Sequence, residues 1–210
     1  KIRADEEHKV NSPWNIASDF RVNMGFTPGG IRGMLEEYET DNHSGMNVEE
    51  IAGLIFDYTS GYPFLVSRLC KLMDEEVAGS VSFPDKAAAW TKEGFLEAEK
   101  LLLSEKNTLF ESLMGKLNDY PSLKRKLYSI LFGGKKLVYN PDDPAVDIAV
   151  MFGFVKNDGG TLRIANRIFE TRLYNYFLTT DEAQNSELFI FAPDDKLKFV
   201  QNGHLNMELV

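Results

Sequence analysis

The chain has 210 residues, of which 43% are hydrophobic and 12% aromatic, so composition excludes disorder for most of its length. The net charge of -9 excludes indiscriminate binding to polyanions. A single cysteine, Cys70, excludes an internal disulfide and suits the reducing cytoplasm, where we expect the protein to reside. No apolar run is long enough to span a bilayer, so we expect no membrane partner.

The N-terminal region is predicted to be irregular as far as residue 23, with Trp14 as an aromatic anchor in a turn-rich run. Thr27 followed by Pro28 is typical of a helix start, because the first side chain can cap and the second has a preset φ. Helical spacing then continues to a terminator at residues 41–45.

Three further helices are predicted before residue 107. Asn47, with Glu50 three residues later, favours a capped start for the second helix. Residues 59–62 break that helix, Pro63 opens the third, and the fourth begins near Thr91. Four helices joined by short connections predict a small helical bundle, so the expected fold class is mainly α.

The pattern and the charge both change near residue 106. Residues 1–106 carry 11 basic and 19 acidic side chains, whereas residues 107–180 carry 10 basic and 7 acidic ones. The second region predicts, in order, a helix up to Pro121, a helix up to Gly133-Gly134, a strand at 137–139, a helix from Pro144, a hairpin turning at 157–160 and a helix over 167–178. Helix, helix, strand, helix and hairpin is the order of a winged helix with a β-hairpin wing.

The strongest local signal is the helix junction Gly61-Tyr62-Pro63. Gly61 permits a tight turn or a close approach to a ligand, because no Cβ is in the way. Pro63 fixes the first helical φ and lacks an N–H that would otherwise be left without a partner. The spacing alone leaves two interpretations open: an ordinary turn between helices, or a rigid helix start that lies against a planar ligand.

The junction resembles the Gly-x-Pro motif in the helical lid of signal-transduction (STAND) ATPases, a branch of the AAA+-like ATPases in which a winged helix follows the lid. Three blocks, at residues 11–17, 57–65 and 166–170, look like a bacterial family of predicted AAA-ATPases. The resemblance covers essentially the whole chain. In that family a P-loop domain precedes this region and a PD-(D/E)XK nuclease-like domain often follows it, so both are the partners that the resemblance implies.

The resemblance also implies a division of the chain into four parts. These are a strap from the ATPase core at 1–26, a helical lid bundle at 27–106, a winged-helix domain at 107–180, and a linker or the start of a C-terminal domain at 181–210.

Three residues match positions that contact nucleotide in such lids. Gly61 and Pro63 would sit over the adenine, and Arg68 could approach the phosphates as a second-sensor arginine does. For Arg68 the alternative is a solvated side chain or a salt bridge to Glu75 or Asp74.

No phosphate-binding loop is present in this sequence. The run Gly133-Gly134-Lys135-Lys136 lacks the spacing and the hydroxyl of Gly-x-x-x-x-Gly-Lys-Ser/Thr. No apolar run ends in paired acids that would hold magnesium. We therefore expect no enzyme activity and no cofactor in this segment, with ATP and Mg²⁺ bound only together with the missing P-loop domain.

A winged helix also raises DNA binding as an alternative. The predicted reading helix at 144–152 has no basic residue and one acid, so sequence-specific reading is not expected. A basic edge through the second helix and the wing could instead contact a nucleic-acid backbone, another protein or a neighbouring domain; it comprises Lys124, Arg125, Lys126, Lys135, Lys136, Lys156 and Arg163.

Other chemistry is weakly indicated. His8, His43 and His204 are far apart, without a second ligand at helical or Cys-x-x-Cys-like spacing, so no metal site is expected. The chain is thus expected to be a regulatory lid and winged-helix module of a multidomain switch ATPase. A nucleic-acid-binding module is the alternative.

Overall fold

The computed structural model describes residues 25–179 together with the strand residues 200–201 and 204–205. Within these residues the chain is mainly helical and carries a small three-stranded antiparallel sheet, so the predicted mainly α class is confirmed. Nearly all of the predicted strap at 1–26, including Trp14, lies outside the described residues, as does most of 181–210.

The helices of residues 25–106 begin where the capping residues predict. The side chain of Thr27 accepts a hydrogen bond from the amide of Gly30 (3.1 Å), and that of Asn47 accepts one from Glu50 (3.3 Å). These bonds satisfy amide groups that a helix start leaves open. A π-helical turn and a short helix join the four predicted helices; the elements are α1 (Pro28–Asn42), α2 (Val48–Thr59), α3 (Pro63–Leu72), η3 (Met73–Val77), α4 (Lys86–Ala89) and α5 (Lys92–Ser104).

The apolar stripes of α2, α3 and α5 form the core of this part. Ile55, Leu65, Leu69, Phe95 and Leu102 are fully buried there. Each such side chain contributes roughly 1.5–3 kcal/mol relative to an exposed one. The packing of these three helices therefore holds both ends of the 59–62 junction in place.

The second part contains the sheet. The elements are α6 (Thr108–Asp119), α7 (Pro121–Leu131), β1 (Leu137–Val138), α8 (Pro144–Met151), β2 (Val155–Asp158), β3 (Thr161–Ile164) and α9 (Arg167–Leu178), followed by an antiparallel pair of strands, β4 (Val200–Gln201) and β5 (His204–Leu205). The strand order is β1-β3-β2. The predicted hairpin is confirmed: Asp158 pairs with Thr161, and Gly159 and Gly160 between them have φ of 55° and 83°. Positive φ at both positions suits the tight turn that matches strand twist.

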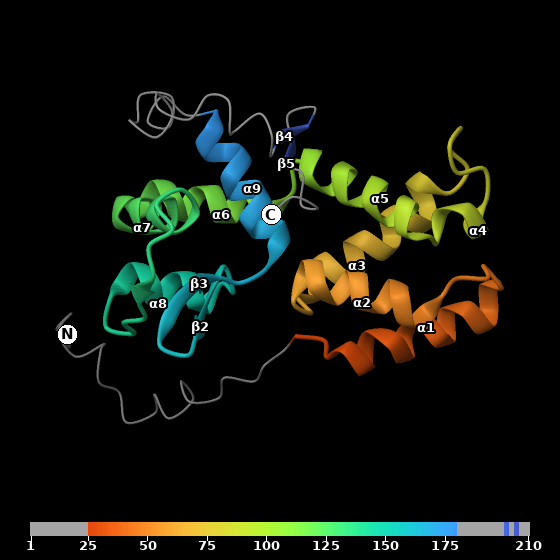
Figure 1. Ribbon diagram of the computed structural model, residues 1–210, viewed down its shortest axis with the longest axis horizontal. Helices are drawn as coiled ribbons and strands as arrows, with labels where there is room; N and C mark the ends of the chain where they lie inside the picture. Colours follow the sequence, from red (N-terminus) through yellow and green to blue (C-terminus); the bar gives the residue numbers. More distant parts are fainter. Residues whose placement is uncertain (1–24, 180–199, 202–203, 206–210) are drawn as a thin grey trace, which may run out of the picture.

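Helix α9 lies between the two parts. Figure 1 shows α1 to α5 on one side, α6 to α8 with the sheet on the other, and α9 between them. Phe169 and Leu173 of α9 are fully buried, and the buried apolar residues of both parts belong to one continuous cluster. A displacement of either part therefore disturbs packing in the other.

Candidate functional site

The junction at residues 59–63 reverses the chain between α2 and α3. Ser60 and Gly61 have φ of 47° and 74°, which is the left-handed conformation that ends many helices. The hydroxyl of Thr59 donates to the carbonyl of Ile55 (2.6 Å) and accepts from the amide of Gly61 (3.1 Å). Pro63 occupies the first turn of α3, as predicted. The turn is thus held by both its backbone and a buried side chain.

Gly61 lies against the backbone of Phe26. The amide of Phe26 donates to the carbonyl of Gly61 (2.8 Å), and a Cβ on Gly61 would lie 1.9 Å from the carbonyl oxygen of Phe26. The group that approaches Gly61 closely is therefore the backbone of Phe26, which belongs to the chain itself. This hydrogen bond also brings the starts of α1 and α3 together, since Phe26 precedes Thr27 and Gly61 precedes Tyr62.

The outer side of the junction is apolar. Phe26 is 38% exposed and Phe64 is 39% exposed, and they flank the partly buried Pro63. No side chain among the described residues caps the start of α3. Flat apolar groups beside an open helix start can accept the face of a planar ligand, while the helix dipole favours a negative group nearby.

Tyr62 connects the junction to the second part. Its ring meets Phe169 of α9 edge to face, with 5.3 Å between centroids, and its hydroxyl donates to the carbonyl of Phe152 (3.3 Å). Gly153 has φ of 70°, and a Cβ there would lie 2.9 Å from Cε2 of Tyr62. Burial raises the pKa of the Tyr62 phenol. Sequence reasoning assigned Tyr62 no role, because nothing local indicates a partner 90 residues away.

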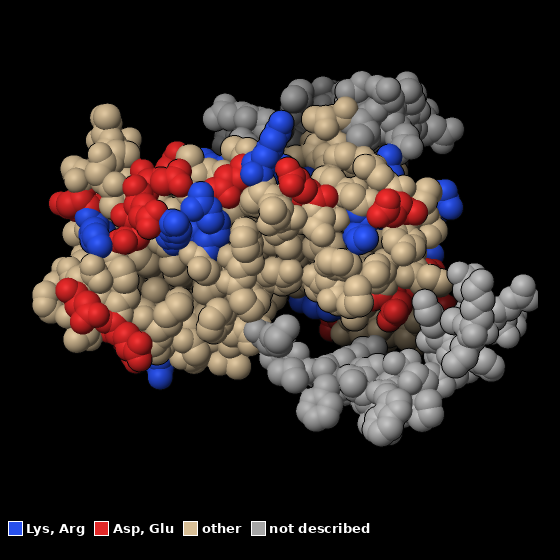
Figure 2. All heavy atoms as spheres, turned by 180° about the vertical axis from the view of Figure 1, so that it is seen from behind, with Lys and Arg blue, Asp and Glu red and all other residues tan. Residues whose placement is uncertain are grey.

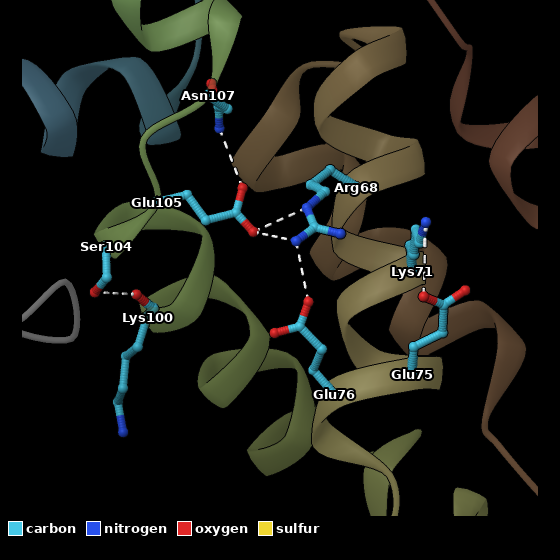
Figure 3. Close-up of polar contacts among 8 residues, drawn as sticks. All are labelled: Arg68, Lys71, Glu75, Glu76, Lys100, Ser104, Glu105 and Asn107. Carbon is cyan, nitrogen blue, oxygen red and sulfur yellow. Dashed lines mark hydrogen bonds and ion pairs between the residues drawn. The ribbon is translucent and has the colours of Figure 1, made fainter.

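Arg68 lies two turns from the junction and binds two carboxylates. Its Nε donates to Oε1 of Glu105 (2.8 Å), its Nη2 binds the same oxygen, and Nη2 also donates to Glu76 (3.0 Å). Figure 3 shows the guanidinium between these two acids. The hydrogen bonds that Arg68 donates to Glu105 are the main cause of the raised pKa of Arg68. Arg68, which the resemblance assigned to the nucleotide phosphates, therefore binds carboxylates in this structure.

The predicted salt bridge of Arg68 is correct in kind, but its predicted partners were wrong. Glu75 binds Lys71 (3.6 Å), and Asp74 binds Lys86 (2.8 Å). The cause is the π-helical turn η3, which accommodates more residues per turn than an α-helix and advances the aligned position by about one. Glu76 rather than Glu75 is thereby brought level with Arg68. The sequence carries no clear signal for such a turn.

The partner of Arg68 belongs to the connector between α5 and α6, which we define as residues 104–107. Glu105 also accepts a hydrogen bond from the side-chain amide of Asn107 (3.2 Å), and Asn107 caps α6 by accepting from Phe110 (3.0 Å). From the other side, Arg172 of α9 donates to the carbonyl of Leu103 and stacks over the ring of Phe110. Arg68 of α3 thus binds the connector itself, and Arg172 of α9 binds the carbonyl of Leu103, just before the connector.

Groups from α2 and α5 face the start of α9. The guanidinium of Arg167 lies 4.3 Å from the ring centroid of Tyr58 in α2. In α5, Glu99 is only 9% exposed, and burial raises its pKa to about 7, although the positive charge of Arg167 offsets part of that rise. Arg167 belongs to the 166–170 block singled out in the sequence.

The predicted basic edge is divided in the structure. Lys126 binds Asp143 (2.8 Å), Arg163 binds Asp158 (2.8 Å), and Lys124 lies over the ring of Tyr176. The register places Lys156 beside Arg163 on the hairpin. Arg125 and Lys135 instead line a pocket beside α7. Figure 2 shows acidic and basic side chains close together and no broad basic patch on the face seen.

The predicted reading helix α8 presents an acidic and apolar surface. Asp147 is exposed, Met151 is 68% exposed, and Asp143 caps the helix by accepting from Ala145 (3.0 Å). Helix α8 contains no lysine or arginine. That DNA is not read here by sequence stays a prediction.

Two further kinds of site were considered in the sequence, a metal centre and a reactive cysteine. No group of three or more His, Cys, Asp or Glu residues there is placed to hold a metal ion. Burial raises the pKa of the Cys70 thiol to about 12, which keeps it protonated and unreactive at neutral pH. No described helix has the length and apolar character needed to cross a membrane. His8 lies outside the described residues, and of His204 only the backbone is described.

Comparison with protein-family models, with curated proteins and with solved structures finds no match to this chain.

Proposed function

We propose that this chain is the regulatory lid and winged-helix module of a nucleotide-dependent switch ATPase of the AAA-ATPase-like kind, coupling nucleotide state to domain rearrangement. The observation that carries the proposal is the position of Tyr62. Its neighbours Gly61 and Pro63 belong to the junction, while its ring is packed between Gly153 and Phe169 of the second part. A ligand that shifts the junction therefore shifts a side chain that both parts share.

The order α6, α7, β1, α8, β2, β3 supports a winged helix for residues 107–180, and the helices before it support a lid for 27–106. Phe26, Pro63 and Phe64 suit the flat face of an adenine. Triphosphate and Mg²⁺ need a phosphate-binding loop and acidic ligands, which would come from a P-loop domain. When bound, ATP would supply the charge and the free energy of hydrolysis.

Arg68 would respond to nucleotide by exchanging partners. It holds Glu105 in the connector and Glu76 in η3. A triphosphate held against the lid would compete for the guanidinium, because phosphate and carboxylate use the same donor geometry. Loss of the Arg68–Glu105 contact would loosen the connector and shift the population toward rearranged domain positions.

The proposal is tested in the full-length protein with its P-loop domain. We expect Pro63→Ala and Arg68→Ala to weaken binding of a fluorescent ATP analogue, or to abolish the nucleotide-dependent change in radius of gyration measured by small-angle scattering. Lys71→Ala is the matched control, since Lys71 lies on the same helix and pairs only with Glu75 among the described residues. If Pro63→Ala and Arg68→Ala both leave the affinity for the ATP analogue and the nucleotide-dependent change in radius of gyration unchanged, the proposal is wrong.

Nucleic-acid binding is the second candidate function. The exposed pair Lys156 and Arg163 on the hairpin favours it. Polarisation with a labelled duplex at low salt decides between the two, since binding lost on Lys156→Gln would favour the nucleic-acid module. Binding that is absent, or that salt suppresses regardless of sequence, would favour the switch module.

A further inference from the structure

A basic pocket of about 360 Å³ lies between α7 and the segment that leads into β1. Its lining residues are Ser122, Arg125, Lys126, Ser129, Lys135, Leu137 and Val138. The four from α7 are spaced at i, i+3, i+4 and i+7, so they form one face of that helix. The opposite face is packed in the core through Leu123 and Leu127.

The turn after α7 builds the second wall of the pocket. Gly134 has φ of 58°, and a Cβ on Gly133 would lie 2.8 Å from the carbonyl oxygen of Ser129. The same carbonyl accepts from the amides of Gly133 (3.1 Å) and Lys135 (3.2 Å). This turn returns the chain onto the helix, so that Lys135 lines the pocket together with Arg125.

The charge of the pocket is mostly uncompensated. Asp143 binds Lys126 (2.8 Å), and this contact lowers the pKa of the Asp143 carboxyl. Within the described part of the chain, no carboxylate lies within ion-pair distance of Arg125 or Lys135. Two cations therefore face one concavity in a chain whose net charge is -9. Cations held together without counterions favour an anion.

The remaining lining defines the kind of anion. The hydroxyl of Ser129 donates to the carbonyl of Arg125 (2.9 Å), whereas that of Ser122 makes no hydrogen bond within the described residues and can donate. Donors reach the pocket from α7 and from the turn, so they can bind several oxygens of one tetrahedral anion. Leu137 and the 83% exposed Val138 add an apolar edge.

We propose that this pocket binds a small phosphate monoester. The dianionic phosphate lies between Arg125 and Lys135 with Ser122 as a further donor, and the organic group rests on Leu137 and Val138. The site is independent of the junction at Gly61–Pro63, and it needs no other domain.

The experiment titrates the 210-residue chain with phenyl phosphate and with inorganic phosphate by calorimetry at low ionic strength. Phenyl phosphate is expected to bind one to one and more tightly than inorganic phosphate, because only the ester has a group for the apolar edge. Equal affinity for the two, or no binding of either, would overturn the proposal. A twenty-nucleotide single strand without terminal phosphates tests the other source of phosphate, since binding of the strand but not of phenyl phosphate would also overturn it.

Paired variants assign the binding to the pocket. The double variant Arg125→Gln with Lys135→Gln is expected to weaken the binding of phenyl phosphate at least tenfold. The double variant Lys92→Gln with Lys106→Gln removes the same charge from exposed positions outside the lining, and it is expected to change affinity less than twofold. Equal weakening by both pairs would mean a diffuse charge effect and would overturn the assignment. Matching circular dichroism spectra and melting temperatures establish that both variants are folded.

Discussion

The ring of Tyr62 occupies the space that a side chain on residue 153 would need, since a Cβ on Gly153 would lie 2.9 Å from Cε2 of Tyr62. Two residues far apart in the sequence are thus fitted to one another, one by having a large ring and the other by having no side chain. Phe169 closes the same contact from α9. The helix junction and the sheet-bearing part consequently meet at the ring of Tyr62.

Removing that ring is expected to destabilise the fold. Tyr62→Ala leaves a cavity between the two parts and should lower the free energy of unfolding by about 2–4 kcal/mol. Urea denaturation measures the loss, and hydrogen exchange should report faster opening at Phe154, whose amide bonds to Ala149. Tyr62→Phe is the matched control: it keeps the ring and loses only the 3.3 Å bond to Phe152, so it should cost under about 1 kcal/mol. Equal losses in both variants would contradict a packing role.

Alanine at residue 61 should be costly, in contrast with alanine at residue 53. Gly61→Ala forces an L side chain into positive φ, which costs about 1–3 kcal/mol, and its Cβ meets the carbonyl of Phe26 at 1.9 Å. Gly53 lies inside α2 with nothing within 4 Å of its Cβ position. Gly53→Ala should therefore stabilise by about 0.5–1 kcal/mol. Thermal unfolding measured on both variants checks the opposite signs, and a stable Gly61→Ala protein would disprove the close approach at Phe26.

The ion pair between Arg68 and Glu105 should show measurable coupling. A double-mutant cycle with Arg68→Met and Glu105→Gln is expected to give about 1–2 kcal/mol, because two donors share one carboxylate and both side chains are largely buried. The same cycle with Glu76→Gln should give under about 0.5 kcal/mol, since Glu76 is half exposed. Chemical denaturation provides the energies. A larger coupling to Glu76 than to Glu105 would refute the assignment of the connector as the main partner.

Stability should depend on pH through Glu99. Its folded pKa of about 7 lies above the ordinary value of 4.5, so between these values the folded chain binds more protons than the unfolded one. The contribution of Glu99 to stability therefore falls as pH rises from about 4.5 to about 7. Glu99→Gln removes the ionisable group, and at pH 8 it should stabilise the chain by up to about 3 kcal/mol relative to its effect at pH 4.5.

The matched control for Glu99 is Glu97→Gln, on the same helix but exposed and paired with Lys100 (3.1 Å). Denaturation at pH 4.5, 6 and 8 with both variants isolates the buried carboxylate. An advantage of Glu99→Gln that does not grow between pH 4.5 and pH 8 would show that the carboxylate keeps its ordinary pKa in the folded chain.

The elements were predictable because their signals are local. Thr27, Asn47, Pro63 and Thr91 mark helix starts by capping or by fixing φ, and the Gly159-Gly160 pair marks a hairpin. The π-helical turn η3 and the short helix α4 were not predicted. A π turn depends on tertiary packing more than on residue preference, and a four-residue helix shows too little periodicity to recognise.

The site was predictable only in part for a related reason. Gly61 and Pro63 indicate a rigid turn, and Arg68 indicates a charged contact. A single sequence does not show which distant residue contacts each of them. Phe26 opposite Gly61, Gly153 opposite Tyr62 and Glu105 opposite Arg68 are contacts that only the fold defines. Whether nucleotide joins these contacts stays a prediction for the full-length protein.

The connector at residues 104–107 is held by two separate contacts. It is fastened from α3 through Glu105 and, next to it, from α9 through Leu103, and these helices belong to different parts of the chain. A stimulus that frees Arg68 alone leaves the bond from Arg172 intact, and a movement of α9 alone leaves the bond from Arg68. Full release of the connector therefore requires both contacts to break, whereas the loss of one of them only loosens it.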